Sequence, residues 1–366
     1  MSLRSYYGLN GKGPGVPHLL SGNLPPPDIL DQLLPETKAI LHTLASFPTA
    51  TSLDTKITTE RFRQLYNVLS EKISSSLSGR HLGHYKAIAK SEELSSIWVA
   101  MMSIPHTAGF SPTRWHDIVD VMLEKNPGNS KIHRLRIVAL QESDFNQGNR
   151  LAIGRPVMHH LEDTKVLPKM QHGSRPAKLC ISAVLSKQLQ FEIQRYKKHP
   201  ITYIENDATG CYDRIVNPLI ILFLKKLGVP SPVVDSLAQT WQETAHRIKT
   251  LYGISNQQYQ NSLAFFLFGP GQGSTIGPLL WLISFLLTVH SIHHTTPAIQ
   301  LKSADRRTTY TSRGDAFVDD AGLGCMMEFP QNFDTGLIQQ SPSTLVTNLQ
   351  ALAQRWERLL FSTGGH

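Results

Sequence analysis

The chain has 366 residues, of which 40% are hydrophobic and 17% are charged. This composition is ordinary for a globular protein, and the length allows two or three subdomains. The net charge of +8 suits a polyanionic partner, although a mildly basic protein without such a partner would carry the same charge. Three widely spaced cysteines, Cys180, Cys211 and Cys325, exclude a disulfide framework and a Cys-x-x-Cys metal pair, and they indicate a reducing compartment.

Nothing in the sequence predicts secretion or membrane insertion. The first residues, Met1–Tyr7, contain no apolar signal core. The longest apolar run, within 278–290, holds roughly 12 residues where a bilayer needs roughly 20, so it predicts a buried helix. We therefore expect an intracellular protein of the nucleus or cytoplasm, with no membrane partner.

The first half of the chain is predicted to be mainly helical. Residues 1–57 hold many prolines and glycines, which predict a lead-in with a short helix over 28–46. A helical pattern begins at Thr58, after which apolar residues recur at helical spacing. The segment Gly79–Lys86 interrupts this pattern. Further elements follow: helices over 92–104 and 114–124, a strand over 135–140, and a long helix over 176–196. The last of these carries an apolar stripe of Leu179, Val184, Leu185, Leu189 and Ile193.

The second half mixes strands and helices. A short β-rich run over 201–204 ends at Asp207, and Gly228 closes a helix over 217–227. Residues 315–327 alternate as a β-hairpin would, around a tight turn at Asp319-Asp320. The other predicted elements are helices over 231–245, 275–292 and 343–361, and strands over 247–252 and 263–268.

Two acidic segments far apart in the sequence are the first candidates for chemistry. Asp207 follows a predicted strand, and the pair Asp319-Asp320 sits in the predicted hairpin. A strand end and a hairpin turn can lie at one edge of a sheet, where their repulsion would favour a bound cation. Two divalent ions held in this way are the usual apparatus for phosphoryl transfer. The alternative is that Asp207 caps a turn and the acidic pair is a solvated hairpin tip.

Four further residues are candidates for binding a nucleotide or a nucleic acid. Gln272 and Gly273 belong to a glycine-rich turn that opens a helix but lacks the lysine and spacing of a phosphate loop; a plain turn is the alternative. Arg136 and Arg175 could neutralise a triphosphate or a template backbone, although surface arginines would look the same. Tyr212 could pack beneath a sugar and exclude a 2′-hydroxyl, or it could be a core aromatic residue.

In order, these segments resemble motifs A, B and C of reverse transcriptases, and most closely those of non-LTR eukaryotic retrotransposons. Motif A is represented by Asp207-x4-Tyr212-Asp213, motif B by Gln272-Gly273, and motif C by Phe317-Val-Asp319-Asp320. Two upstream segments, 135–140 and Gln171-x-Gly173-x-Arg175, are similar to segments of the fingers region. The resemblance covers roughly residues 78–366, and the ordered set of three motifs is specific.

The resemblance implies an α+β right-hand polymerase with helical fingers and an antiparallel-sheet palm. Residues 1–57 would be a lead-in, 58–200 fingers-like, 201–330 the palm with part of 247–272 fingers-like, and 331–366 an incomplete palm end. Asp207 and Asp319 would bind two Mg²⁺ ions, or Mn²⁺ instead, with Asp320 adjacent and the Ala208 carbonyl as a further ligand. Tyr212 would select dNTPs, and Gln272-Gly273 would contact an RNA template paired with a DNA primer. The primer 3′-oxygen would then attack the α-phosphate and release pyrophosphate.

The sequence also departs from the family pattern. Ile137 follows Arg136 where proline is usual, and Val318 replaces the usual alanine. The chain stops at Ser362–His366, where motif D would begin, so we expect the thumb to be missing. A truncated, inactive retroelement relic that only binds nucleic acid is therefore the alternative function. An RNA-directed RNA polymerase would carry Gly-Asp-Asp and no bulky gate, and an unrelated helical binding protein is the remaining class.

Overall fold

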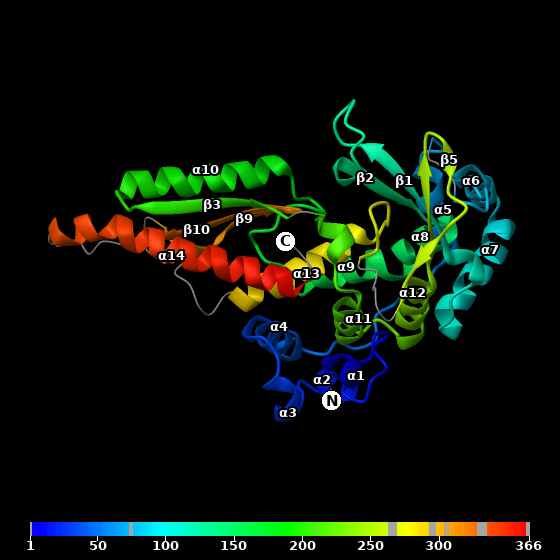
Figure 1. Cartoon of the computed structure of the whole chain (residues 1–366), viewed down its shortest axis with the longest axis horizontal. Coiled ribbons are helices and arrows are strands. Elements are labelled where there is room, and N and C mark those ends of the chain that lie inside the picture. Colours follow the sequence, from blue (N-terminus) through cyan, green and yellow to red (C-terminus); the bar gives the residue numbers. More distant parts are fainter. Residues whose placement is uncertain are drawn as a thin grey trace. The chain divides into compact units, whose positions relative to one another are not determined.

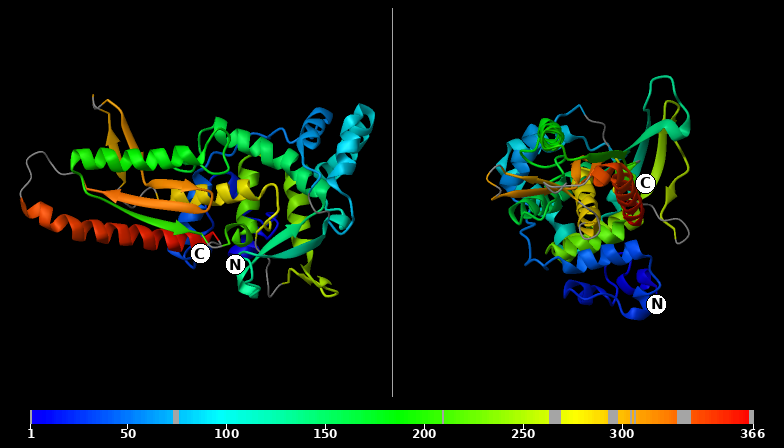
Figure 2. Two further views of the ribbon diagram at one scale, coloured as in Figure 1. Left: turned by 90° about the horizontal axis from the view of Figure 1, so that it is seen from above. Right: turned by 90° about the vertical axis from the view of Figure 1, so that its left-hand side faces the viewer.

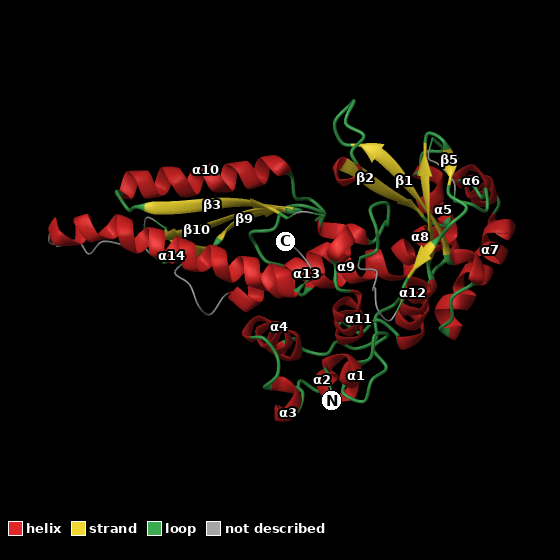
Figure 3. Ribbon diagram, in the orientation of Figure 1, coloured by secondary structure: helices red, strands yellow, loops and turns green. Residues whose placement is uncertain are grey.

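The computed structural model describes residues 2–72, 76–208, 210–262, 269–292, 298–303, 305, 307–327 and 335–363, and for 335–341 it describes the backbone only. The predicted α+β class is confirmed: helices predominate, and the strands form several small sheets (Figures 1 and 3). The chain divides into two compact units that are interleaved along the sequence. Unit 1 comprises Met1–Gln32, Leu44–Thr164 and Tyr212–Leu280, and unit 2 comprises Leu33–Thr43, Lys165–Cys211 and Trp281–His366.

Unit 1 packs helices around a small mixed sheet. Its strands are β1 (Asp117–Glu124), β2 (Leu135–Leu140), β4 (Ala245–Thr250), β5 (Gly253–Ile254) and β6 (Tyr259–Gln260). Strand β1 runs antiparallel to β2 and parallel to β4, while β5 and β6 both pair with β4. Its helices are α1 (Leu3–Tyr7), α2 (Val16–Leu20), α3 (Pro27–Leu30), α5 (Thr59–Val68), α6 (Leu82–Lys90), α7 (Glu92–Ala108), α8 (Ser143–Asn149), α9 (Arg155–Asp163), α11 (Asn217–Lys226) and α12 (Ser231–Glu243).

Unit 2 is built on the antiparallel sheet β3-β10-β9. These strands are β3 (Ile201–Asp207), β9 (Gly314–Phe317) and β10 (Asp320–Met326). Figures 1 and 2 show this sheet between the helices α10 (Cys180–Lys197) and α14 (Thr335–Ser362). A separate hairpin is formed by β7 (Ile299–Lys302) and β8 (Thr309–Ser312). Two helices, α4 (Pro35–Ser46) and α13 (Gly277–Ile292), contribute residues to both units.

Side-chain caps set the start of several helices. Thr58 Oγ1 accepts a hydrogen bond from Arg61 N at 3.2 Å where α5 begins, and Ser91 Oγ accepts one from Leu94 N at 3.2 Å where α7 begins. Helix α6 begins inside the segment 79–86 that the sequence predicts to interrupt the helical pattern. There His81 Nδ1 accepts from Gly83 N and His84 Nδ1 accepts from His81 N, so two histidine rings cap the helix in place of serine and glutamate.

Most of the predicted elements are confirmed. The strands over 135–140 and 201–204 are β2 and β3, and the helices over 92–104, 217–227, 231–245, 275–292 and 343–361 are α7, α11, α12, α13 and α14. The helix predicted over 28–46 forms as two pieces, α3 and α4. The predicted strand over 263–268 lies outside the described residues, as do 331–334 and 364–366 of the predicted palm end.

The prediction of a helix over 114–124 is wrong, because Asp117–Glu124 forms the strand β1. Its Ile118, Val119 and Val121 are β-branched, and such side chains favour an extended backbone. The strand is also paired on both sides, with Asp120 opposite Ala139 of β2 and Ile248 of β4. Pairing partners so far away in the sequence outweigh the helical spacing of the apolar residues.

Four of the five residues in the apolar stripe predicted for the long helix α10 do not face the core, and the fifth, Ile193, is half-buried. Leu179, Val184, Leu185 and Leu189 are more than half exposed, whereas Ala183, Gln190 and Gln194 are buried. The helix therefore packs through Ala183, its amide side chains and the ring of Phe191. Gln194 Nε2, for example, donates to the carbonyl of Gln300 at 3.1 Å.

The apolar helix α13 is buried, as predicted: Leu280, Ile283, Leu286 and Leu287 are at most 1% exposed. Among the helices in the described ranges, none combines the length with the apolar character that a membrane crossing requires.

Gly228 closes α11 and offers a test of backbone constraint. Its φ is 81°, and a Cβ there would lie 2.2 Å from the carbonyl oxygen of Thr51. Gly128 has nearly the same φ of 83°, but a Cβ there would meet nothing within 4 Å. We expect Gly128→Ala to lower the free energy of unfolding by about 1 kcal/mol, the left-handed backbone penalty alone.

We expect Gly228→Ala to lower the free energy of unfolding by about 3 kcal/mol or more, because steric overlap adds to that penalty. Urea titration of both variants measures the difference. Equal losses for the two variants would show that the approach of Gly228 to Thr51 is not a real constraint.

Candidate functional site

The β3–β10 pairing brings the two distant acidic segments together in unit 2. Asp207 is the last residue of β3, Asp320 is the first residue of β10, and the two are Cα partners in the antiparallel register. Their carboxylates therefore lie on the same face of the sheet, because directly opposed side chains share a face. Both side chains are exposed, and Asp319 is half-buried.

The turn that carries Asp319 differs by one residue from the prediction. Phe317 pairs with Asp320, so the two turn residues are Val318 and Asp319 rather than Asp319 and Asp320. Val318 has a φ of 61°, which is strained for a β-branched side chain. The carbonyl of Asp319 accepts a hydrogen bond from the N–H of the buried Ala208 at 3.4 Å, so the turn is tied to the end of β3.

A fully buried glutamine holds the strained turn in place. Gln171 Nε2 donates to the carbonyl of Val318 at 3.0 Å, and Gln171 Oε1 accepts from Val318 N at 3.1 Å and from Gly173 N at 2.9 Å. The indole N–H of Trp281 donates to the same Val318 carbonyl at 2.7 Å. Three side-chain hydrogen bonds therefore fix the peptide groups on both sides of Val318. The segment around Gln171 reaches this position by running beside β9, where His172 N donates to Ala316 O at 2.8 Å.

Gly173 and Arg175 belong to the same segment as Gln171. A Cβ on Gly173 would lie 2.2 Å from Val318 N, so only glycine allows this close approach. Arg175 Nη1 donates to the carbonyls of Pro168 and Gln171, both at 3.0 Å. The structure therefore places the Arg175 guanidinium on its own loop, and its predicted contact with template or triphosphate stays a prediction.

The sheet face that carries Asp207 and Asp320 continues as a polar network beneath α10. Tyr203 donates its hydroxyl proton to Asp315 Oδ2, and its ring packs edge-on against Phe191 of α10 with 5.5 Å between centroids. A Cβ on Gly322 or Gly324 would overlap the Tyr203 ring, so these two glycines of β10 leave the space that the ring occupies. Lys187 forms an ion pair with Glu205 and lies 4.6 Å above the Tyr203 ring.

The electrostatics of the acidic edge favour a cation. Desolvation and then the neighbouring carboxylates of Asp319, Asp207 and Glu205 raise the pKa of Asp320 above its ordinary value. Burial also raises the pKa of Asp315. Within the described ranges, no group of three or more His, Cys, Asp or Glu side chains forms a ready-made metal site. The paired carboxylates fit Mg²⁺ nonetheless, because Mg²⁺ usually takes one or two protein carboxylates and completes its shell with phosphate and water.

The remaining predicted residues lie in unit 1. Gln272 O accepts from Ala139 N at 2.6 Å, and Gln272 Nε2 donates to Asp213 Oδ2 at 3.4 Å. A Cβ on Gly273, where φ is 115°, would lie 2.5 Å from the Ala139 carbonyl. The glycine-rich turn is therefore seated on the end of β2, and its carbonyl at Gly273 accepts from Asn146 Nδ2 at 2.9 Å.

Tyr212 is half-buried and lies beside this turn. A Cβ on Gly269 would meet its carbonyl oxygen at 1.9 Å, and a Cβ on Gly277 would lie 3.5 Å from its ring. The segments that carry Tyr212 and Gln272 are thus brought together within unit 1. Arg136 is exposed on β2 opposite Leu123, and no described residue forms an ion pair with it.

The sequence analysis missed three residues of the site: Gln171 and Trp281, which hold the acidic turn, and Tyr203, which binds Asp315 on the same sheet face. Gln171 lies in the segment that resembles part of the fingers, where Arg175 is the only charged candidate and an uncharged glutamine gives no signal of a site residue. Trp281 lies within an apolar run and Tyr203 within a β-rich run, and neither carries a local signal.

A comparison of the sequence with protein-family models and with curated proteins found no match.

The contacts of Gln171 predict a large effect on stability. Gln171→Leu leaves the N–H groups of Val318 and Gly173 without their acceptor in a buried place, so we expect a loss of about 3 kcal/mol in the free energy of unfolding. Val318→Gly in the same background should recover about 1 kcal/mol by relieving the strained φ. Gln188→Leu, at an exposed position of α10, is the control and should change stability by less than about 0.5 kcal/mol. A Gln171→Leu loss no larger than that of the control would contradict the holding role.

Because neighbouring carboxylates help to raise the pKa of Asp320, we expect that pKa to change when a nearby charge is removed or added. Asp319→Asn removes one neighbouring carboxylate and should lower the pKa of Asp320, and Mg²⁺ should lower it in the unsubstituted chain because a cation favours the ionised carboxyl. Carbon-detected NMR titration of the carboxyl group measures both shifts. A titration of Asp320 that is unchanged in millimolar Mg²⁺ would argue against a cation at this edge.

Proposed function

We propose that this chain is the reverse transcriptase domain of a non-LTR-type retrotransposon, a nucleotidyltransferase that extends a DNA primer with dNTPs along an RNA template. The proposal includes a right-hand polymerase fold, with the sheet of unit 2 as part of the palm. It also includes an intracellular location, in the nucleus or the cytoplasm. The observation that carries it is the register of β3 on β10, which sets Asp207 opposite Asp320 with Asp319 in the adjoining turn.

This observation supports a polymerase site over the alternative that the two acidic segments are unrelated surface turns. The two segments are separated in sequence by a glycine-rich turn and a long apolar helix. Even so, Asp207 and Asp320 lie opposite each other at the same end of one sheet. A solvated hairpin tip needs no buried glutamine or tryptophan to fix its backbone. Here Gln171 and Trp281 both act on Val318, which adjoins Asp319. Buried side chains that fix the backbone next to an acidic residue are expected in a catalytic site.

Each residue has a defined part in the proposal. Asp207 and Asp319 would hold two Mg²⁺ ions, with Asp320 and the Ala208 carbonyl beside them. When bound, the ions would supply Lewis-acid activation of the primer hydroxyl and charge neutralisation of the phosphates. The holding contacts of Gln171 and Trp281 would keep the carboxylates from shifting during the reaction, which matters because positioning contributes much of the rate enhancement.

Unit 1 would supply the contacts to the nucleotide and nucleic acid. Tyr212 would exclude a 2′-hydroxyl, and Gln272 and Gly273 would contact the template–primer pair. Arg136 is exposed and has no described ion-pair partner, so it is available for a phosphate. The net charge of +8 would favour association with the nucleic-acid backbone.

Primer extension on an RNA template with dNTPs and Mg²⁺ tests the proposal. We expect template-dependent incorporation, and we expect Asp319→Asn to reduce it by roughly 10²-fold or more, the scale of losing one electrostatic group from an active site. Glu192→Gln is the matched control, because it neutralises a half-exposed carboxylate of α10 in the same unit, away from the acidic turn. It should leave the rate within about twofold.

The outcomes separate the two functions that the sequence leaves open. If a folded sample binds the template–primer but incorporates no dNTP with Mg²⁺ or with Mn²⁺, that result would favour the inactive relic that only binds nucleic acid. Incorporation that is insensitive to Asp319→Asn would overturn the assignment of the catalytic edge. Incorporation of ribonucleotides in place of dNTPs would favour an RNA-directed RNA polymerase.

A further inference from the structure

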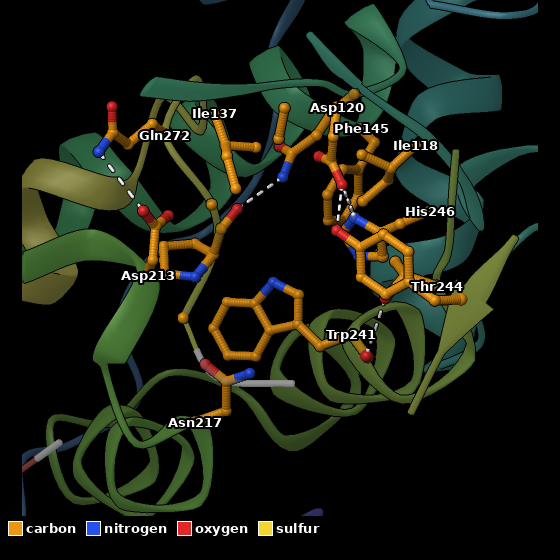
Figure 4. A pocket seen from close by; sticks show the side chains of 16 residues that line it. Ile118, Asp120, Ile137, Phe145, Asp213, Asn217, Trp241, Thr244, His246 and Gln272 are labelled. Carbon is orange, nitrogen blue, oxygen red and sulfur yellow. Dashed lines mark hydrogen bonds and ion pairs between the residues drawn. The ribbon is translucent and has the colours of Figure 1, made fainter. Parts of the chain in front are cut away.

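Unit 1 contains a cavity of about 300 Å³, and Asp213 and Gln272 are among the residues that line it (Figure 4). Because Gln272 belongs to the glycine-rich turn of the proposed template–primer contact, this cavity is part of the site already described. A feature to which the proposed function assigns no role lies elsewhere in unit 1, on helix α7, which Figure 1 shows beside α6 and α12.

Helix α7 has two faces, and its own unit covers only one of them. The covered face packs against α5, α6 and α12, and its Ser95, Val99, Met102 and His106 are at most 8% exposed. The other face carries residues that are all exposed, and its four large side chains are each 52–54% exposed. We call this second set the α7 stripe: Leu94, Ile97, Met101, Ile104 and Ala108.

The α7 stripe has the spacing of a coiled-coil seam. Its successive members lie alternately three and four residues apart, which is the heptad spacing that aligns apolar side chains where one helix packs on another. A surface helix that needs no partner carries charged residues on its outer face, as α5 does with Glu60 and α6 with Lys90. Between Leu94 and Phe110, by contrast, the sequence holds no Asp, Glu, Lys or Arg. The pattern is therefore typical of a helix that is covered on both sides.

The polar residues beside the α7 stripe can be buried without loss of hydrogen bonds. The hydroxyl groups of Ser96, Ser103 and Thr107 donate to carbonyl groups of α7 itself, at 2.7, 2.7 and 2.9 Å. A partner helix need not supply an acceptor for them, so their desolvation costs little. Ala100, which is also exposed, is small enough to let a second helix approach closely.

The absence of charge decides the kind of partner. A nucleic acid or an anionic membrane surface needs Lys or Arg on the contact face, whereas the only charged residues of α7 are Glu92 and Glu93 at its start. The matching surface is an uncharged helix face with the same heptad spacing. A second copy of α7 is such a face, so two copies of this chain are complementary to each other.

Glu93 also sets the orientation of the two helices. Glu92 is paired with Arg63 at 3.6 Å, and Glu93 is exposed beside Leu94. Parallel copies would bring their Glu93 carboxylates together, whereas antiparallel copies keep them more than roughly 20 Å apart at 1.5 Å per residue. Antiparallel order also sets Leu94 against the small Ala108.

We propose that α7 is the contact surface of a homodimer, in which the α7 stripes of two copies pack antiparallel about a two-fold axis near Met101. One helix supplies fewer residues than the roughly 20–30 that each side of a standard interface contains, so the dimer is reversible. We expect a dissociation constant on the order of 10 μM. The inference goes beyond the proposed polymerase and does not depend on its metal site.

Sedimentation equilibrium of the full chain, freed of nucleic acid, tests the proposal at concentrations on either side of that constant. We expect a monomer–dimer equilibrium that persists in about 0.5 M salt, because apolar contacts are not screened as charge contacts are. A chain that stays monomeric well above the expected constant, or an association that salt abolishes, would overturn the proposal. Growth beyond the dimer would also overturn it, since a two-fold contact closes on itself. Binding of the monomer to phosphatidylcholine vesicles in place of dimerisation would assign the α7 stripe to a membrane surface instead.

Ile104→Glu is the sharpest variant, because it places a carboxylate in the apolar contact. It should weaken the dimer at least about tenfold and leave the melting temperature unchanged, since Ile104 is exposed in the monomer. Ile132→Glu is the matched control, because it makes the same replacement at a side chain that is 75% exposed between β1 and β2. It should leave the dissociation constant within about twofold. Met101→Glu serves as a second variant if Ile104→Glu does not fold. A dimer that these variants leave intact, or that Ile132→Glu weakens equally, would refute the surface.

Cysteine cross-linking tests the antiparallel order. The exposed Cys180 is first replaced by serine, which leaves only buried cysteines. In this background Met101→Cys should form a disulfide-linked dimer with oxidised glutathione, because the two copies of position 101 meet near the axis. Leu94→Cys should form none, since antiparallel order holds its two copies far apart. Failure of Met101→Cys to cross-link, or equal cross-linking by Leu94→Cys, would overturn the proposed packing.

Discussion

The register between β3 and β10 is the constraint on which the acidic site depends. Side chains alternate along a strand, so a slip by one residue would turn Asp207 away from Asp320 and toward the face that carries Ala321, Leu323 and Cys325. Those three residues are at most 3% exposed. Burial of an unpaired carboxylate among them would cost several kcal/mol, whereas a single ladder hydrogen bond contributes only about 1 kcal/mol. The hydrophobic face of the sheet therefore fixes the place of the acidic residues on the other face.

A second constraint acts on the turn itself. A β-branched residue with positive φ costs about 1–3 kcal/mol, and nothing in the two-residue hairpin compensates for it locally. The compensation comes from Gln171 and Trp281, whose hydrogen bonds to the peptide groups around Val318 outweigh that cost. The conformation of Asp319 is thus set by residues roughly 40 and 150 positions away, which belong to the same unit but to different elements. Rigidity of this kind comes from the surrounding fold and not from the turn sequence.

How far the sequence predicts this molecule depends on whether the decisive interaction is local. Gly228 ends α11 as expected, because a helix stop needs only a residue that tolerates positive φ. The alternating pattern near Asp319 predicts the hairpin, but the turn is displaced by one residue because Gln171 stabilises an unfavourable φ at Val318. Strand β1 was mistaken for a helix because its pairing partners in β2 and β4 are not visible in its own residues. The cavity near Gln141 was not foreseen at all, since six separate stretches of unit 1 supply its walls.

The packing of Tyr203 against two glycines limits how this sheet can change. A Cβ at Gly322 would lie 2.3 Å from the ring, and one at Gly324 would lie 2.7 Å from it, so the single ring fills the place of two missing side chains on the neighbouring strand. The three positions form one packing unit, and substitutions among them will not be additive. A larger residue at either glycine is tolerated only together with a smaller one at position 203, which would also release Asp315 from its hydroxyl partner. Divergence in this part of the sheet is therefore expected to begin at position 203, because the glycines gain room only after that ring has been lost.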